Sequence, residues 1–393
     1  MEITILTCLA LFVLAALVTW HIIFSRAISR PPEPTQRLAR YPSISMIRPI
    51  RGIDPGQLEN LRAALDNGYP GEIETLFVFD EETDEGLPNA LAAVREHLES
   101  GRPGIAKIVI AGPPPEGRTG KLNAMIVGSR IARGELIAFG DSDTRPDKKV
   151  LRRCVEALVN GGPKVGCAFA PVVVVGDMRS AGDVGYAMML NSLYAPIAAW
   201  AARKLNGELP FIMGQIMVFQ RKALDAIGGV GCAAGQLVDD MYIGTCLNKA
   251  GYANLMINHP LYIVTSDLAL SRFFRVYRRW LMFWRNGLPI SFTWPAVLQA
   301  VRFFTALILL GVAFLQNQFL AGLIALLAFL AFGLSAENLH KRLGAPAIPF
   351  RLKWILWAVL LMAPFVLISM IKRDLDWRGR NYELAWTTRL KKG

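Results

Sequence analysis

The chain begins with an apolar run, Ile3–Phe24, which is interrupted only by Thr, Cys and His side chains. At about 1.5 Å per residue, a helix of this length spans the hydrocarbon core of a bilayer. A cleaved signal peptide is the rival interpretation, but no basic region precedes the run and no small-residue cleavage site follows it. We therefore predict an uncleaved transmembrane anchor over residues 1–25.

The charges that flank this run predict its orientation. Only Glu2 precedes it, whereas four arginines follow it: Arg26, Arg30, Arg37 and Arg40. Because basic residues stay on the cytoplasmic side, we expect the N-terminus outside and the chain from residue 25 onward in the cytoplasm. The prolines of residues 26–42 make that segment a stiff linker. The sequence thus predicts a multi-pass protein of the inner (cytoplasmic) membrane whose main domain faces the cytoplasm.

Composition indicates a mixed protein, partly soluble and partly embedded in a membrane. Of the 393 residues, 53% are hydrophobic and 19% are charged, and the mean hydropathy is +0.34. This is too apolar for an ordinary soluble protein and too charged for an all-membrane bundle. The net charge is +12, and the lysines and arginines cluster beside the apolar segments. This favours a lipid surface over nucleic acid as the partner. None of the cysteines forms a C-x-x-C pair, so neither a disulfide framework nor a zinc site is expected.

Strand and helix patterns alternate from Ser43 to about Ala170. We expect strands at residues 44–48, 74–79, 106–111 and 135–139, and helices at residues 55–66, 87–98 and 121–133. Strands separated by helix-length segments predict an α/β fold in which helices cover both faces of a parallel sheet. In such sheets ligands bind beyond the carboxyl ends of the strands. We expect this catalytic domain to cover residues 43–270.

The last third of the chain returns to membrane composition. Three apolar runs occur there: Phe303–Leu315, Phe319–Ala336 and Trp354–Ile371, the last of which contains Pro364. Each run is short or interrupted, so two hairpin-like insertions and three full spans fit equally well. Basic residues flank both ends of the last run, which favours a re-entrant or proline-broken segment there. We assign residues 299–372 to membrane helices and residues 373–393 to a basic cytoplasmic tail.

Asp141-Ser142-Asp143 directly follows the strand expected at residues 135–139. Two carboxylates at this edge of a sheet can share a divalent cation, Mg²⁺ or Mn²⁺, with the diphosphate of a nucleotide sugar. The alternative is a capped turn, because Asp-Ser-Asp is also a good turn sequence. The position after a buried strand favours a site in which Asp143 and Asp141 bind the metal and the donor.

Further donor-binding candidates lie at the end of the second strand and at the start of a helix. Asp80 ends the second strand and is expected to accept hydrogen bonds from a base or ribose. Lys121 and Asn123 follow the loop Gly117–Gly120 and open a helix, where a basic side chain and free amides suit a uridine diphosphate. The plainer interpretation of Lys121 is a solvated helix residue.

Asp239 and Asp240 stand together in a mostly apolar stretch. Adjacent carboxylates are costly there unless they are solvated, paired or used in chemistry. An inverting sugar transfer needs one base that deprotonates the acceptor hydroxyl. Asp240 is the candidate for this base, and a solvated N-cap pair before a helix at residues 241–249 fits the local sequence equally well.

Residues 271–285 interleave arginines with aromatic residues at helical spacing. The plain interpretation is an amphipathic helix at the membrane interface, and we expect such helices over residues 271–298. A more specific interpretation adds that part of this helix closes over the active site and that an arginine neutralises the diphosphate. The residues concerned are Arg275, Arg278, Arg279 and Trp280. Phe283 and Trp284 are then expected on the acceptor side. The Gly and Pro breaks of Asn286–Pro295 predict a segment that lies at the interface and does not span.

These segments resemble a known family. Arg48–Pro55 and Gly68–Pro70 are similar to the N-terminal signature of ceramide glucosyltransferases, which are family-2-type inverting enzymes of the GT-A fold, with hopanoid-associated glycosyltransferases as close relatives. The carboxylates at positions 80, 141, 143 and 240 and the Arg279-Trp280 pair resemble the successive motifs of that superfamily. Phe211–Arg221, which contains Gly214 and Gln215, resembles its acceptor-side segment, and Trp377–Arg380 its terminal motif.

The resemblance implies transfer of a sugar, expected to be glucose, from a UDP-sugar to a membrane lipid, expected to be ceramide, with inversion at the anomeric carbon. One departure is that Val276 stands where the family has Gln or Arg, so Arg275 or Arg278 has to substitute. Hopanoid or diacylglycerol acceptors remain open. A processive polysaccharide synthase is disfavoured by the small C-terminal region, and a non-catalytic membrane scaffold by the retained carboxylates.

Overall fold

The computed structural model describes residues 4–29, 36–288, 290–353, 374–383 and 389–390. The chain divides into two compact units, each assembled from three segments. The helical unit comprises Met1–Arg30, Val173–Arg203 and Thr265–Ile371, and the sheet unit comprises Pro31–Val172, Lys204–Val264 and Lys372–Gly393. The sheet unit contains every carboxylate that the sequence singles out.

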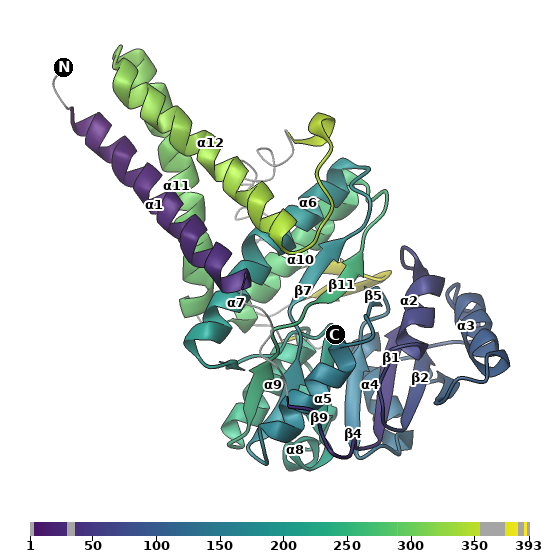
Figure 1. Ribbon diagram of the computed structural model, residues 1–393. Coiled ribbons are helices and arrows are strands. Elements are labelled where there is room, and N and C mark those ends of the chain that lie inside the picture. The colour runs from purple at the N-terminus through teal and green to yellow at the C-terminus, as the bar shows by residue number, and fades with distance from the viewer. Residues whose placement is uncertain (1–3, 30–35, 289, 354–373, 384–388, 391–393) are drawn as a thin grey trace. The chain divides into compact units, whose positions relative to one another are not determined.

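An eight-stranded sheet organises the sheet unit (Figure 1). Its order is β3-β2-β1-β4-β9-β6-β10-β8. The strands are β1 (Ile44–Ile50), β2 (Ile73–Phe79), β3 (Ile105–Ile110), β4 (Leu136–Gly140), β6 (Val165–Phe169), β8 (Glu208–Leu209), β9 (Ile216–Gln220) and β10 (Ala253–Met256). The first four in this order are parallel, and β9 lies antiparallel between β4 and β6. The predicted strands at the four expected places are confirmed.

Helices cover both faces of this sheet because β1, β2 and β4 are apolar along nearly their whole length. The helices are α2 (Gln57–Leu65), α3 (Leu87–Glu99), α4 (Gly120–Ile131), α5 (Val150–Asn160), α8 (Arg221–Ala226) and α9 (Asp239–Lys249). Ile50 packs in one cluster with residues of α2 and α3, and Met46 in another with residues of α5. Ile47, on the opposite face of β1, packs against Gly128 of α4. The alternation of side chains along a strand produces this division.

The strand order creates a switch point between β1 and β4. From β1 the chain builds outward through β2 to β3 and then returns to place β4 on the other side of β1. The connections on either side of this point leave in opposite directions, which opens a crevice beyond the carboxyl ends of the two strands. Arg48 lies near the end of β1 and Asp141 follows β4, so both reach this crevice.

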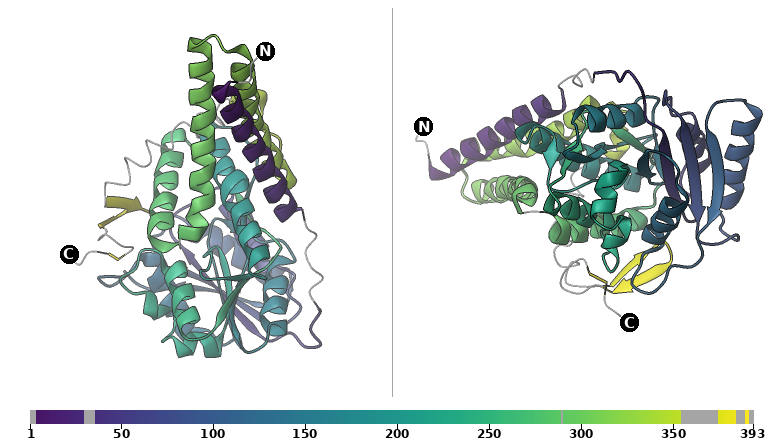
Figure 2. Two further views of the ribbon diagram at one scale, coloured as in Figure 1. Left: turned by 90° about the vertical axis from the view of Figure 1, so that its left-hand side faces the viewer. Right: turned by 90° about the horizontal axis from the view of Figure 1, so that it is seen from below.

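The helical unit contains three helices that are long and apolar enough to cross a membrane among the residues the structure describes. They are α1 (Ile5–Ile28), α11 (Ile290–Leu315) and α12 (Phe319–Arg342), and they pack side by side (Figure 2). Ala10, Leu17, Phe303, Ala325 and Phe332 form the centre of their contact. The same unit contains α6 (Ala181–Met189), the π-helix η1 (Leu190–Tyr194), α7 (Ala195–Lys204) and α10 (Leu270–Gly287).

Two expectations for the last third of the chain concern where its helices begin and end. The boundary between the two apolar runs that end at Leu315 and begin at Phe319 is confirmed: α11 ends at Leu315, α12 begins at Phe319, and Asn317 between them adopts a left-handed conformation with φ of 55°. The predicted non-spanning segment Asn286–Pro295 is helical from Ile290 onward, where α11 begins. The part of α11 that is long and apolar enough to cross a membrane is Val297–Leu315, which agrees with the expectation that Asn286–Pro295 does not span. Its place at the interface stays a prediction. Proline near the start of a long helix removes a single backbone hydrogen bond, and the apolar residues that follow sustain the helix. The predicted run Trp354–Ile371 lies outside the described residues.

Candidate active site

A buried arginine holds the Asp141-Ser142-Asp143 loop at the end of β4. Arg48 in β1 is 2% exposed, and its Nη2 donates to the carbonyl oxygens of Asp141 at 2.5 Å and of Thr144 at 2.9 Å. Burial lowers the pKa of Arg48 to about 10, although nearby carboxylates oppose this shift. The guanidinium therefore stays charged at neutral pH and ties the loop to the centre of the sheet.

A second contact holds the same loop from the side. The Ser142 hydroxyl donates to Asp54 Oδ2 at 2.5 Å, and both side chains are buried. With its middle residue turned toward Asp54, the loop presents its two flanking carboxylates, Asp141 and Asp143, from one turn. This is the arrangement that a D-x-D pair needs to share one ligand.

Lys121 brings the donor loop and the catalytic candidates together. Its Nζ lies 2.6 Å from Asp141 Oδ1 and donates to the carbonyl oxygen of Gly214 at 3.5 Å. The carboxylates of Asp239 and Asp240 also act on this ammonium. Residues from three separate segments therefore meet around one cation, and the interpretation of Lys121 as a solvated helix residue is wrong.

Asp239 and Asp240 form the first turn of α9. Asp239 Oδ1 accepts the Asp240 amide at 2.9 Å, and Asp240 Oδ1 accepts the Met241 amide at 2.8 Å. Asp240 Oδ2 points toward Gly214, where an added Cβ would lie only 2.6 Å from it. The pair therefore does serve the helix N-terminus, but Asp240 keeps one oxygen directed at the segment predicted to lie on the acceptor side.

Burial and mutual repulsion shift the ionisation of this cluster. Burial raises the pKa of Asp240 to about 7, and Asp239 adds to the rise while Lys121 opposes it. Burial also raises the pKa of Asp239. Burial alone would lower the pKa of Lys121, but the carboxylates around it outweigh this effect and hold its pKa above the ordinary value. A carboxylate that titrates near neutrality is suited to act as a general base.

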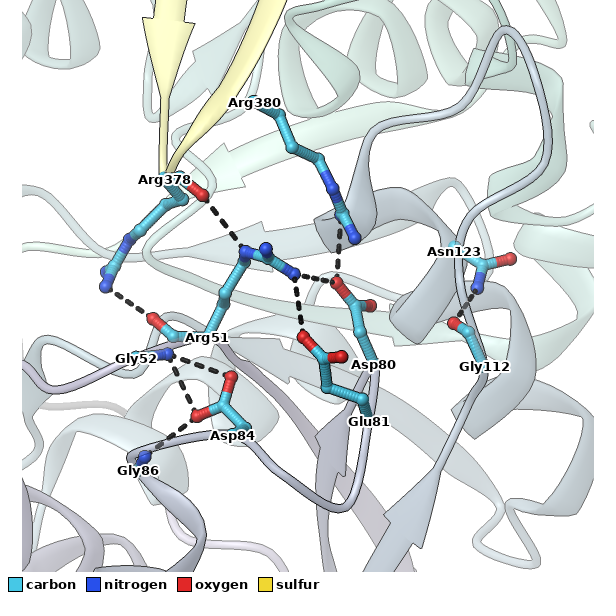
Figure 3. Close-up of polar contacts among 10 residues, drawn as sticks. All are labelled: Arg51, Gly52, Asp80, Glu81, Asp84, Gly86, Gly112, Asn123, Arg378 and Arg380. Atoms are coloured by element: carbon cyan, nitrogen blue, oxygen red, sulfur yellow. Dashed lines mark hydrogen bonds and ion pairs between the residues drawn. The ribbon is translucent and has the colours of Figure 1, made fainter.

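Asp80 directly follows β2, and its carboxylate lies between Arg51 and Arg380 (Figure 3). Its Oδ2 pairs with Arg51 at 3.0 Å and with Arg380 at 2.9 Å. Asn123 is buried in α4 and donates to the carbonyl oxygen of Gly112 at 3.3 Å. Asp80 therefore reaches the crevice as expected, whereas Asn123 supports the loop between β3 and α4.

The acceptor-side candidates divide between the two units. Gly214 and Gln215 precede β9, and the Gln215 carbonyl accepts the Asp141 amide at 3.1 Å. The other predicted residues, Arg275, Arg278, Arg279, Trp280, Phe283 and Trp284, lie on α10 in the helical unit. Within that unit the Trp280 ring packs edge-on against Tyr194 of η1 at 5.2 Å. Phe283 is half-buried, and the side chain of Trp284 is not among those that the structure describes.

Four site residues carry roles that the sequence analysis did not assign: Arg48, Arg51, Asp54 and Arg380. A signal existed for Arg48, since a charged residue inside an apolar strand must have buried partners. The partnership between Arg380 and Asp80 joins residues at opposite ends of the chain, and no local pattern indicates such a contact.

The helical unit also contains an apolar cavity. Trp20, Met188, Tyr277, Phe332 and Ala336 are among the side chains that line it. The cavity adjoins the π-helical turn η1, a rare distortion that is common at functional sites. Ser192 in that turn donates to the Ala336 carbonyl oxygen at 2.8 Å, which fixes one wall against α12. The lining of the cavity is apolar, and its volume of about 60 Å³ has room for only a few methylene groups.

The fold and the carboxylate cluster define a glycosyltransferase of the GT-A fold that carries membrane helices. The chain matches Glycosyl transferase family 21 over residues 3–390 and belongs to this family. The resemblance drawn from the motifs is thereby confirmed, and so is the expected fold class.

Individual relatives agree with this assignment. The chain is 22% identical to ceramide glucosyltransferase 1 of Caenorhabditis elegans over 92% of its own length and 74% of that protein. It is 25% identical over 43% of its length to a UDP-forming cellulose synthase of Dictyostelium discoideum, covering 15% of that protein. The solved mannosyltransferase PcManGT from Pyrobaculum calidifontis shares the fold, with a TM-score of 0.51 at 19% identity over 92% of this chain and 99% of that one.

The close approach of Gly214 to Asp240 yields a first prediction. Gly214→Ala places a methyl group too close to Asp240 Oδ2, so the carboxylate must move. A displacement of about 1 Å at a reacting group can cost about 100-fold in rate, and we expect kcat for sugar transfer to fall by that order. Gly140→Ala is the control, because the nearest atom to its added Cβ is an ordinary 3.5 Å away. Equal losses in the two variants would contradict the proposed contact.

Proposed function

We propose that this glycosyltransferase transfers a sugar, glucose in the first instance, from a UDP-sugar to the hydroxyl of a membrane lipid such as ceramide, with inversion. One observation carries the proposal: Lys121 pairs with Asp141 and donates to the Gly214 carbonyl oxygen, and Asp240 Oδ2 points toward Gly214, so the candidate donor and base residues are close neighbours. The ceramide glucosyltransferase relative supports a lipid acceptor, since it matches most of both chains. The membrane helices of the helical unit support it independently.

In the proposed reaction the acceptor oxygen attacks the anomeric carbon from the face opposite the diphosphate. Asp240 takes the hydroxyl proton as the new carbon–oxygen bond forms and the bond to the diphosphate breaks, and UDP leaves with the bonding electrons. Attack from the opposite face inverts the configuration. Lys121 holds Asp141 in place and keeps positive charge beside the carboxylates while this happens.

The donor site fits a divalent cation of the kind bound by few protein ligands. The described residues contain no cluster of three or more His, Cys, Asp or Glu side chains around a metal position. Mg²⁺ and Mn²⁺ sites of this type use one or two carboxylates and complete their shell with substrate phosphates and water. Because Asp141 already pairs with Lys121, we assign the main ligand role to Asp143 and a secondary one to Asp141. The bound ion would act as a Lewis acid on the leaving diphosphate, and PcManGT was solved with GDP-Man and Mn²⁺.

The arginine-rich helix α10 completes the proposal on the membrane side. We assign Arg279 and Trp280 to closure over the reacting sugar, and Arg275 or Arg278 to the role that Val276 cannot perform. Phe283 and Trp284 are assigned to guiding the lipid. The proposed orientation places the catalytic unit on the cytoplasmic side, where the leaflet supplies the acceptor laterally.

A pH profile tests the base. The pKa of Asp240 is raised to about 7, and only the ionised carboxylate can accept a proton. We therefore expect kcat to fall about tenfold per pH unit below about pH 7. Asp240→Asn should lower kcat by about 10²–10⁴-fold and leave UDP affinity, measured by calorimetry, near the wild-type value. The exposed Asp225→Asn is the control. A silent Asp240→Asn beside an inactive Asp239→Asn would assign the base to the other carboxylate.

The metal assignment predicts a separate behaviour. Excess chelator should abolish transfer, and added Mn²⁺ or Mg²⁺ should restore it. Asp143→Asn should lose most turnover and should also lose the metal-dependent part of UDP binding, because the ion and the diphosphate bind together. Calorimetric titration of UDP with and without Mn²⁺ measures this coupling. Full activity in chelator would refute the metal role.

The cavity tests the lipid acceptor. Ala336→Trp fills the cavity wall, whereas Leu334→Trp on the same helix points outward, since Leu334 is 67% exposed. Burial of a methylene group contributes about 0.8 kcal/mol, so excluding two of them from the cavity weakens lipid binding by about 15-fold. We expect Ala336→Trp alone to raise the apparent KM for lipid by such a factor and to leave the KM for UDP-sugar unchanged. Mass spectrometry of the products from a panel of UDP-sugars and lipids identifies both substrates. An unchanged lipid KM would show that the acceptor does not use this cavity.

A further inference from the structure

The C-terminal tail forms a β-hairpin at the donor crevice. Strands β12 (Asp374–Trp377) and β13 (Arg380–Glu383) pair antiparallel and are joined by Arg378 and Gly379. Both turn residues have positive φ, 55° and 72°, as a tight type I′ turn requires. Arginine is uncommon in this conformation, which favours Gly, Asn or Asp. The presence of Arg378 in a left-handed backbone conformation indicates that the arginine side chain has a role there.

Arg378 attaches the tip of the hairpin to the loop that follows β1 and contains Arg51 and Asp54 (Figure 3). Its Nη2 lies 2.7 Å from Asp54 Oδ1, and its Nη1 donates to the Arg51 carbonyl oxygen at 2.8 Å. Arg51 Nε returns a hydrogen bond to the Arg378 carbonyl oxygen at 3.0 Å. Asp54 also binds Ser142, so the hairpin is connected through one buried carboxylate to the loop that carries Asp141 and Asp143.

Arg380 reaches the residue expected to recognise the nucleoside. Its Nη1 pairs with Asp80 Oδ2 at 2.9 Å and lies directly over Gly120, the first residue of α4. A side chain at position 120 would collide with this guanidinium. Arg380 therefore lies beside the N-terminus of a helix, where the backbone amides already favour an anion.

The far end of the tail binds the loop that leads to the base. Arg389 bridges to Gln236 in antiparallel fashion, and the Leu390 amide donates to the Gly235 carbonyl oxygen at 2.9 Å. Only Leu237 and Val238 separate Gln236 from Asp239 in the sequence. The described parts of the tail thus contact both the donor side and the catalytic side of the same crevice.

We propose that Arg378 and Arg380 are donor-binding residues that contact the diphosphate of the nucleotide sugar, with Arg380 exchanging Asp80 for phosphate oxygens so that Asp80 is released to the nucleoside. The inference rests on the proposed function. A diphosphate that enters the crevice meets the carboxylates of Asp54, Asp141 and Asp143, which repel it. The planar guanidinium fork is the side chain best matched to phosphate oxygens, and the hairpin supplies two of them.

Binding measurements on the full-length protein test this assignment. We expect Arg380→Ala and Arg378→Ala to weaken the Kd for UDP by about tenfold or more, since each removes a charged contact. Uridine, which has no phosphate, should bind Arg380→Ala as well as it binds the wild type or better. Arg380→Lys should retain part of the UDP affinity, because it keeps the charge but not the fork. The control is Arg62→Ala, which removes an exposed arginine paired with Glu96 on the outer helices.

The outcomes separate this inference from the proposed function. If both alanine variants keep a UDP affinity within about twofold of wild type and show only a lower Tm, the hairpin arginines stabilise the fold and do not bind the donor. That result would overturn the inference. Tighter UDP binding by the Arg380→Ala variant would show that Arg380 blocks the nucleotide site, and would overturn the inference as well. Both results leave the transferase proposal intact. A wild-type protein that binds neither UDP nor GDP would overturn the two together.

Discussion

The ion pair between Lys121 and Asp141 is the interaction on which the site depends. It joins the first turn of α4 to the loop after β4, and the charge of the same ammonium opposes the upward pKa shifts of Asp239 and Asp240. Without that charge, buried neighbouring carboxylates repel one another and take up protons. One lysine therefore sets both the position of a donor-loop carboxylate and the basicity of the proposed general base.

A second, more deeply buried frame positions this ion pair. Arg48 and Asp54 belong to β1 and the loop after it, and they hold the backbone of Asp141 and the hydroxyl of Ser142. Removing one partner of such a buried charged contact costs more than the contact contributes, because the other is left without compensation. The frame thus explains why the donor loop has a defined shape, and why residues remote from the reacting atoms control it.

The sequence predicts most of the sheet and the place of its main carboxylates, because both follow local rules. Apolar strands alternate with helices, and Asp80 and Asp141 follow strand ends that the topology brings to one edge. The role of Arg380 was not predictable in this way. Its partner Asp80 is separated from it by most of the chain, and only the folded tail brings the two together. The continuation of α11 through Pro295 was not predictable from local rules either, because the hydrogen bond lost at a proline is outweighed by the long apolar helix around it.

Charge balance connects the two substrates of the proposed reaction. In the crevice, carboxylates and basic groups nearly offset one another, through the pairs of Lys121 with Asp141, Arg378 with Asp54, and Arg380 with Asp80. A diphosphate adds negative charge that such a balanced site does not neutralise. A divalent ion held by Asp143 and Asp141 would offset that charge at the loop after β4. In the proposed exchange, a guanidinium that leaves Asp80 for the phosphate would shift negative charge toward the nucleoside side. Lys121 pairs with Asp141 and its charge also acts on Asp240, so it is the group through which donor binding is coupled to the ionisation of the proposed base.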